Sequence, residues 1–304
     1  MKSDTSPPVA AAEPELLPPQ LLTQIDRLEI VTRKIYRGRM KGERRSKRKG
    51  QSVEFADFRN YVPGDDLRLL DWNLYARLDR LIIKLFLEEE DLHFFTLIDA
   101  SESMNFGEPS KLFFAKQIAA CLGYIGLVRA DRVRVETLGQ PAARRTLALR
   151  GRASLHRLVD QLRTIQPGEK TSLAEGVKNF CLRNRGKGVV VLISDFLDKE
   201  GYETALRYLV SQEVDCYVIH VLSREELEPD VQGDLRLVDS EDDDVAEITV
   251  SAPLLDRYQR TLTQFTGGIE QFCRRRGMQY VLCDSQTPPA DLIGRHLRRR
   301  GLVR

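Results

Sequence analysis

Two aspartates in this sequence follow apolar runs that are typical of buried strands. Asp99 follows the run His93–Ile98, and Asp195 follows a run rich in β-branched residues. Asp99 also opens the pattern Asp-Ala-Ser-Glu-Ser, so the hydroxyl groups of Ser101 and Ser103 come shortly after a carboxylate. Carboxylate and hydroxyl oxygens are suitable ligands for a small hard cation such as Mg²⁺ or Mn²⁺. The pattern therefore predicts a cation site on a strand-to-helix loop.

The elements that must position these groups alternate between strands and helices from residue 92 onward, which predicts a mostly parallel sheet with helices on both faces. Predicted strands cover residues 93–98, 132–138, 188–194, 215–222 and 278–283, and predicted helices cover 111–130, 154–165, 172–185, 199–211, 252–276 and 291–300. In such sheets ligands bind beyond the carboxyl ends of the strands, where the strand order reverses. Asp99 and Asp195 would lie at this edge, and Thr171 offers a further hydroxyl from a loop. The plainer alternative is that the two serines and Asp99 only cap the start of a helix.

The segment from residue 51 to 91 predicts a small, mixed, turn-rich unit. Val62-Pro63-Gly64-Asp65 is a turn signal, and residues 81–87 are strand-like. Acidic side chains alternate here with arginines, in the set Arg59, Asp65, Asp66, Arg68, Asp71 and Arg77. Arginine–carboxylate pairs fix geometry because they are planar and often bidentate. Two interpretations stay open: the set and the single tryptophan, Trp72, hold this unit together, or they form a surface that faces a partner.

The charge balance argues against a nucleic-acid coat, because 47 Lys and Arg face 45 Asp and Glu, for a net charge of +2. Ten of the positions 33–49 are nevertheless basic, and residues 239–244 are acidic. The basic segment is either a patch for phosphates, RNA or an acidic partner, or a solvated loop paired with acidic segments. The four His and five Cys are scattered, so a structural zinc site is not indicated.

The set of Asp99, Ser101, Ser103, Thr171 and Asp195 resembles the metal-ion-dependent adhesion site of von Willebrand factor A domains. The resemblance implies a Rossmann-like α/β domain over residues 92–304. It also implies that these five residues surround Mg²⁺ or Mn²⁺, directly or through water.

The upstream residues narrow the resemblance to the bacterial DUF58 family, whose members carry such a segment before a von Willebrand A-like domain. The residues that carry it include Arg59, Tyr61, Gly64, Asp65, Asp66, Arg68, Asp71, Trp72 and Arg77. The resemblance implies a partner of the MoxR-type AAA+ ATPase class. We predict a disordered tail over 1–20, a region over 21–91 that combines a helix, the basic segment and this motif, and the α/β domain. No membrane span or signal peptide is predicted, which favours the cytoplasm.

These observations together predict a non-enzymatic, metal-dependent adaptor that acts in complex assembly or maturation. A partner Asp or Glu would complete the coordination of the metal. The alternatives are a Mg²⁺-dependent phosphohydrolase, and phosphate or RNA binding through residues 33–49. The phosphohydrolase is disfavoured because one common class needs a second aspartate where Ser101 stands. No phosphate-binding P-loop or GxSxG nucleophile motif occurs, and we predict no catalytic residue.

Overall fold

The computed structural model describes residues 14–31, 54–87, 93–138, 148–168, 172–184, 188–231, 233–238 and 245–304. The chain divides into two compact units. The first, here called the α/β unit, comprises Met1–Gly38 and Leu92–Arg304. The second, here called the mixed unit, comprises Arg39–Asp91.

A five-stranded parallel sheet forms the centre of the α/β unit. Its strands are β3 (His93–Asp99), β4 (Arg132–Leu138), β5 (Gly188–Ser194), β6 (Val214–Leu222) and β9 (Gln279–Asp284). They lie in the order β4-β3-β5-β6-β9. Numbered along the chain, this is the doubly wound order 2-1-3-4-5, in which the direction of winding reverses between β3 and β5. The carboxyl ends of β3 and β5 therefore mark the position where such folds bind ligands.

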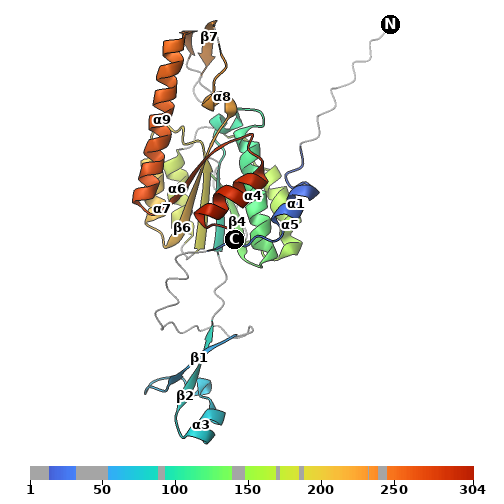
Figure 1. Cartoon of the computed structure of the whole chain (residues 1–304), viewed down its shortest axis with the longest axis vertical. Helices are drawn as coiled ribbons and strands as arrows, with labels where there is room; N and C mark the ends of the chain where they lie inside the picture. Colours follow the sequence, from blue (N-terminus) through green and yellow to red (C-terminus); the bar gives the residue numbers. More distant parts are fainter. Residues whose placement is uncertain are drawn as a thin grey trace, which may run out of the picture. The chain divides into compact units, whose positions relative to one another are not determined.

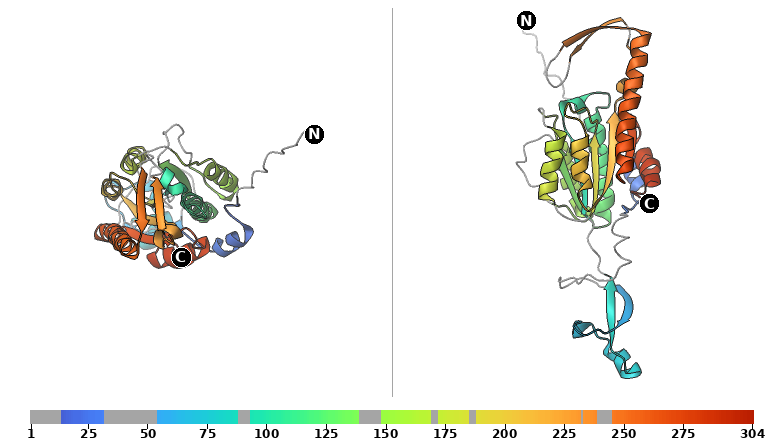
Figure 2. Two further views of the ribbon diagram at one scale, coloured as in Figure 1. Left: turned by 90° about the horizontal axis from the view of Figure 1, so that it is seen from above. Right: turned by 90° about the vertical axis from the view of Figure 1, so that its left-hand side faces the viewer.

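Helices cover both faces of the sheet (Figures 1 and 2). One face packs against α1 (Pro19–Ile25), α4 (Lys111–Val128), α5 (Leu155–Arg163) and the π-helical turn η4 (Leu292–Leu297). The other face packs against α6 (Leu173–Arg183), α7 (Glu203–Val210) and α9 (Ala252–Arg275). Successive residues of β5 alternate between the two cores, with Val189 and Val191 in the first and Val190 and Leu192 in the second. The predicted Rossmann-like sheet with helices on both faces is confirmed.

Shorter elements complete the unit. They are η2 (Glu102–Asn105), η3 (Arg152–Ser154), α8 (Arg224–Leu227), the antiparallel hairpin β7 (Gly233–Val238) and β8 (Val245–Val250), α10 (Pro289–Asp291) and α11 (Arg298–Arg300). The predicted final helix is thus divided into three short segments. Among the described residues between β4 and η3, Leu149 forms an isolated bridge with Val133. The basic segment 33–49 and the acidic segment 239–244 lie outside the described residues.

The N-terminal segment differs from the prediction, because Leu16 and Leu17, within the expected tail, belong to the folded core. Leu16 and Leu17 are 2% and 6% exposed, and Ile25 of α1 is 1% exposed. The helix expected at the start of the region 21–91 is α1, which ends at Ile25, and Ile30 then pairs with Val303. The expected grouping of residues 21–91 into one region is therefore wrong at its start. Apolar burial against α4 and the C-terminus assigns α1 to the α/β unit.

The mixed unit is an antiparallel pair with a helical connection. Strand β1 (Glu54–Asn60) pairs with β2 (Ile82–Leu87), and η1 (Leu67–Leu69) and α3 (Trp72–Leu78) lie between them in the chain. The expected small mixed subdomain is present, although its first strand was not foreseen.

In the part of the chain that the structure describes, one helix, α4, has the length and apolarity to cross a membrane, and 78% of it is buried inside the protein.

Replacing Ile25 by Ala tests whether α1 is an integral part of the α/β unit. Truncation of a buried isoleucine leaves a cavity, so we expect a loss of about 2–5 kcal/mol in the free energy of unfolding. Urea unfolding followed by far-ultraviolet circular dichroism measures this loss. Gln24→Ala, an exposed substitution on the same helix, is the control and should change stability little. Equal stability of the two variants would contradict the packing of α1.

Candidate functional site

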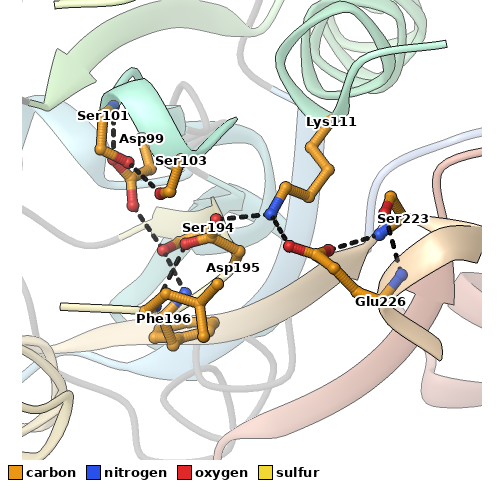
Figure 3. A network of polar contacts seen from close by, with 10 residues as sticks. Asp99, Ser101, Ser103, Lys111, Ser194, Asp195, Phe196, Ser223 and Glu226 are labelled. Carbon is orange, nitrogen blue, oxygen red and sulfur yellow. Dashed lines mark hydrogen bonds and ion pairs between the residues drawn. The ribbon is translucent and has the colours of Figure 1, made fainter. Parts of the chain in front are cut away.

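Asp99 ends β3 and is held by two donors from different elements. Its Oδ1 accepts a hydrogen bond from the Ser101 backbone N–H at 3.0 Å, and its Oδ2 accepts one from the Ser194 hydroxyl at 2.6 Å. The residue is 8% exposed. Because Ser194 is the last residue of β5, this second bond joins the carboxyl ends of the two strands at which the winding reverses (Figure 3).

The two serines of the predicted pattern face each other beside Asp99. The Ser101 and Ser103 hydroxyl oxygens are 3.0 Å apart, at the start of η2. A backbone bridge places Gly168 next to Ser101, with the Gly168 N–H donating to the Ala100 carbonyl at 2.8 Å. Thr171, the predicted third hydroxyl, lies outside the described residues. The structure therefore brings together Asp99, Ser101 and Ser103, and it places Gly168 beside them.

Asp195 follows β5 directly and is 1% exposed. Its Oδ1 accepts from the Leu197 backbone N–H at 3.1 Å. The next residue, Phe196, adopts φ = 57°, a left-handed conformation that is costly for a bulky residue. Its backbone N–H donates to the Ser194 hydroxyl at 2.9 Å. A tight, strained turn thus orients the second predicted carboxylate at the strand end.

A buried ammonium group, which the sequence analysis did not foresee, pairs with Asp195. Lys111 in the first turn of α4 is 0% exposed, and its Nζ lies 2.8 Å from Asp195 Oδ2 and 2.6 Å from Glu226 Oε1. Two signals in the sequence could have indicated this pair. Lys111 falls on the buried face of a strongly apolar helix, and Ser223 with Glu226 forms the spacing of a capping box.

The electrostatics of the site make the charged form of Asp99 unfavourable. Burial, together with the neighbouring charge of Asp195, raises the pKa of Asp99 from 3.8 to about 6. The pKa of His220, which lies behind this edge on β6, is lowered from 6.5 to about 4 by burial. His220 is therefore neutral at pH 7, and its Nδ1 contacts the Tyr280 hydroxyl at 2.8 Å. The charge that acts on Asp99 is therefore that of Asp195, which itself pairs with Lys111.

These donors fit a hard divalent cation by their chemistry. Asp99, Ser101 and Ser103 present only oxygen atoms, and a positive charge beside them would offset the repulsion between the Asp99 and Asp195 carboxylates. Among the described residues no group of three or more His, Cys, Asp or Glu could hold a metal ion. A cation at this edge would therefore depend on the hydroxyl groups as well as on the carboxylates.

The motif residues of the mixed unit have local structural roles. Arg59 makes a bidentate pair with Asp65, with both N···O distances 2.7 Å. Asp66 caps η1 through the Arg68 backbone N–H at 3.0 Å. Asp71 caps α3 and pairs with Lys84 at 3.1 Å. Three of the acidic residues thus maintain the conformation of this unit.

Other members of the motif lie in the turn or on the surface. Gly64 adopts φ = 104°, which the turn requires, and the Tyr61 backbone N–H donates to the Leu81 carbonyl at 2.9 Å. Arg68 and Arg77 are exposed, and Trp72 is 61% exposed with its ring edge-on to Tyr75. Four more large apolar side chains of this unit, Val62, Leu67, Leu69 and Leu78, are also exposed.

The fold and the site define a Rossmann-like α/β protein. Two buried carboxylates and two facing hydroxyls lie at the carboxyl ends of β3 and β5, where the direction of winding reverses. The chain belongs to the DUF58 family, described as a protein of unknown function, whose pattern matches residues 57–268. The predicted family is thereby confirmed.

Several relatives and solved structures are similar to this chain at low sequence identity. Uncharacterized proteins of Mycobacterium bovis and Mycobacterium tuberculosis are 26% identical over 265 residues, which covers 85% of this chain and 83% of theirs. The crystal structure of the conserved hypothetical protein BatB from Bacteroides thetaiotaomicron matches with a TM-score of 0.44 and 16% identity, covering 68% of this chain and 98% of that chain. An aerotolerance-related membrane protein from Bacteroides fragilis matches with a TM-score of 0.42 and 15% identity, covering 68% of this chain and 99% of that one.

Asp99→Asn tests the electrostatic cost of the site. The folded protein binds a proton at Asp99 more tightly than the unfolded chain does, so its free energy of unfolding decreases as the pH rises from about 4 to about 6. The asparagine variant lacks this titration. In the presence of a chelator at pH 7 we expect it to be more stable than the native protein by roughly 2–3 kcal/mol. Urea unfolding at pH 5, 6 and 7 measures the difference, and a less stable variant at pH 7 would contradict the assignment.

Proposed function

We propose that this protein is a non-enzymatic, metal-dependent protein-interaction module of the von Willebrand factor A type. The observation that carries the proposal is the convergence of Asp99, Ser101 and Ser103 at the strand ends where the winding reverses. Asp195 supplies a second carboxylate at the same edge, and Thr171 completes the proposed set of donors. The ion is Mg²⁺ or Mn²⁺, as the oxygen-only ligands favour.

The energetics of Asp99 support a binding role over a structural one. A carboxylate that only capped η2 would gain from ionisation, whereas burial and Asp195 disfavour the ionised form of Asp99. A hydroxyl at Ser101 also lacks the acid–base capacity that a second aspartate gives to a phosphohydrolase. When bound, the metal attracts a carboxylate from a partner. Asp99, Ser101 and Ser103 hold the ion and leave a side open for that group.

The proposed partner contributes an Asp or Glu to the metal, and it is of the MoxR-type AAA+ ATPase class that the family resemblance implies. The exposed large apolar side chains of the mixed unit, Trp72 among them, support a role in protein contacts, because a partner could bury them. The module acts in the cytoplasm, in the assembly or maturation of a complex.

Calorimetric titration with Mg²⁺ and Mn²⁺ tests the metal site. Asp99→Asn should weaken binding at least about tenfold, because it removes a full charge from the coordination sphere. Ser101→Ala should weaken it to a smaller extent, through the loss of one neutral ligand. Glu102→Gln is the matched control, since it removes the same charge from a side chain on the same loop that contacts Asn105. Unchanged affinity in Asp99→Asn would overturn the site.

Affinity capture tests the bridging role of the metal. Wild-type protein and Asp99→Asn are each incubated with a purified MoxR-type ATPase, in Mg²⁺ and in EDTA. We expect retention only for the wild type in Mg²⁺. Equal retention in EDTA would eliminate the metal bridge, while it would leave the partnership itself in place.

A further inference from the structure

Lys111 is a buried, positively charged residue at the sheet edge that carries the proposed metal site. Its side chain is 0% exposed, and it lies between the carboxylates of Asp195 and Glu226, at 2.8 and 2.6 Å. Burial of an unpaired ammonium group is unfavourable because its charge loses hydration, so a charged lysine at such depth needs acidic partners. The two carboxylates come from different elements, since Asp195 follows β5 and Glu226 belongs to α8 (Figure 3).

Glu226 is a well-fixed acceptor for this ammonium. Its Oε2 accepts from the Ser223 backbone N–H at 2.7 Å, which leaves Oε1 for Lys111. The Ser223 hydroxyl in turn accepts from the Glu226 backbone N–H at 3.2 Å, and Ser223 is fully buried. Gly107 permits a close approach here, because a Cβ at that position would lie 2.6 Å from the Ser223 Cβ. The capping box with Ser223 therefore fixes the position of Glu226.

Lys111 and a divalent ion at this edge would carry charges of the same sign near the same carboxylates. Asp99, Asp195 and Glu226 are three acidic side chains, and Lys111 is the cation that contacts two of them. A second cation beside Asp99 would repel the ammonium group and attract the Asp195 carboxylate. Glu226 offers the ammonium a place to remain when its contact with Asp195 weakens.

We propose that Lys111 competes with the divalent cation for Asp195, and that Glu226 retains the Lys111 ammonium when the cation binds. This inference rests on the proposed metal site and adds a regulator to it. Lys111 is a positioning residue, because it acts on the ion through Asp195. The competition lowers the affinity of the site for its cation, and Glu226 moderates that effect.

Opposite effects of two substitutions test the competition. In a calorimetric titration of the full chain with Mn²⁺, Lys111→Met removes the competing charge and should bind at least about threefold tighter than wild type. Glu226→Gln leaves the ammonium on Asp195 alone and should bind at least about threefold weaker. Glu225→Gln is the control, since it removes the same charge from an exposed side chain of α8 and should match wild type.

If Lys111→Met alone does not fold, the double variant Lys111→Met/Glu226→Gln replaces it in the titration. The double variant removes the cation and one of its two carboxylates together. Competition predicts that the double variant binds Mn²⁺ more tightly than Glu226→Gln. Weaker binding in Lys111→Met, or in the double variant relative to Glu226→Gln, would show that Lys111 only supports the structure and would overturn the inference. Absence of Mn²⁺ binding by the wild type is a different failure, because it contradicts the proposed metal site itself.

Discussion

The repulsion between two buried carboxylates, Asp99 and Asp195, is the constraint on which the rest of this edge depends. Parallel pairing of β3 with β5 places both at adjacent strand ends, where little solvent reaches them. The Ser101 backbone N–H and the Ser194 hydroxyl donate hydrogen bonds to Asp99, and the Lys111 ammonium pairs with Asp195. These donors hold the site together, yet the pKa of Asp99 remains raised. A positive charge beside Asp99 would relieve the remaining repulsion, which supports the proposal of a cation at this site.

The backbone conformation after Asp195 also helps to orient its carboxylate. Phe196 adopts a left-handed conformation directly after Asp195, and its buried ring packs edge-on against His220, with the ring centroids 5.4 Å apart. Strain of this kind persists only where the surrounding structure imposes it, and it is concentrated at functional sites. The facing hydroxyls of Ser101 and Ser103 supply neutral oxygen ligands without adding negative charge. A cation held in this way would keep a net attraction for an acidic group from outside, as the proposed function requires.

Hydrophobic patterns in the sequence correctly predicted the strands that depend mainly on local sequence. The strands 132–138 and 188–194 were predicted with their observed bounds. The second is a continuous apolar run rich in β-branched residues, which is typical of a strand buried on both faces. The positions of Asp99 and Asp195 at one edge followed from the general rule for parallel sheets. Lys111 escaped prediction because its partners lie 84 and 115 residues away in the chain. The packing of α1 also escaped it, since an apolar face alone does not identify which surface will cover it. Thr171 stays a prediction.

Anomalous diffraction from crystals soaked in Mn²⁺ is the most direct measurement of the central claim. We predict a single strong manganese peak within bonding distance of the Ser101 and Ser103 hydroxyl oxygens and beside the Asp99 carboxylate, with the Lys111 ammonium retained by Glu226. The absence of a manganese peak at these oxygens, with Asp99 still bonded only to Ser101 and Ser194, would contradict the account.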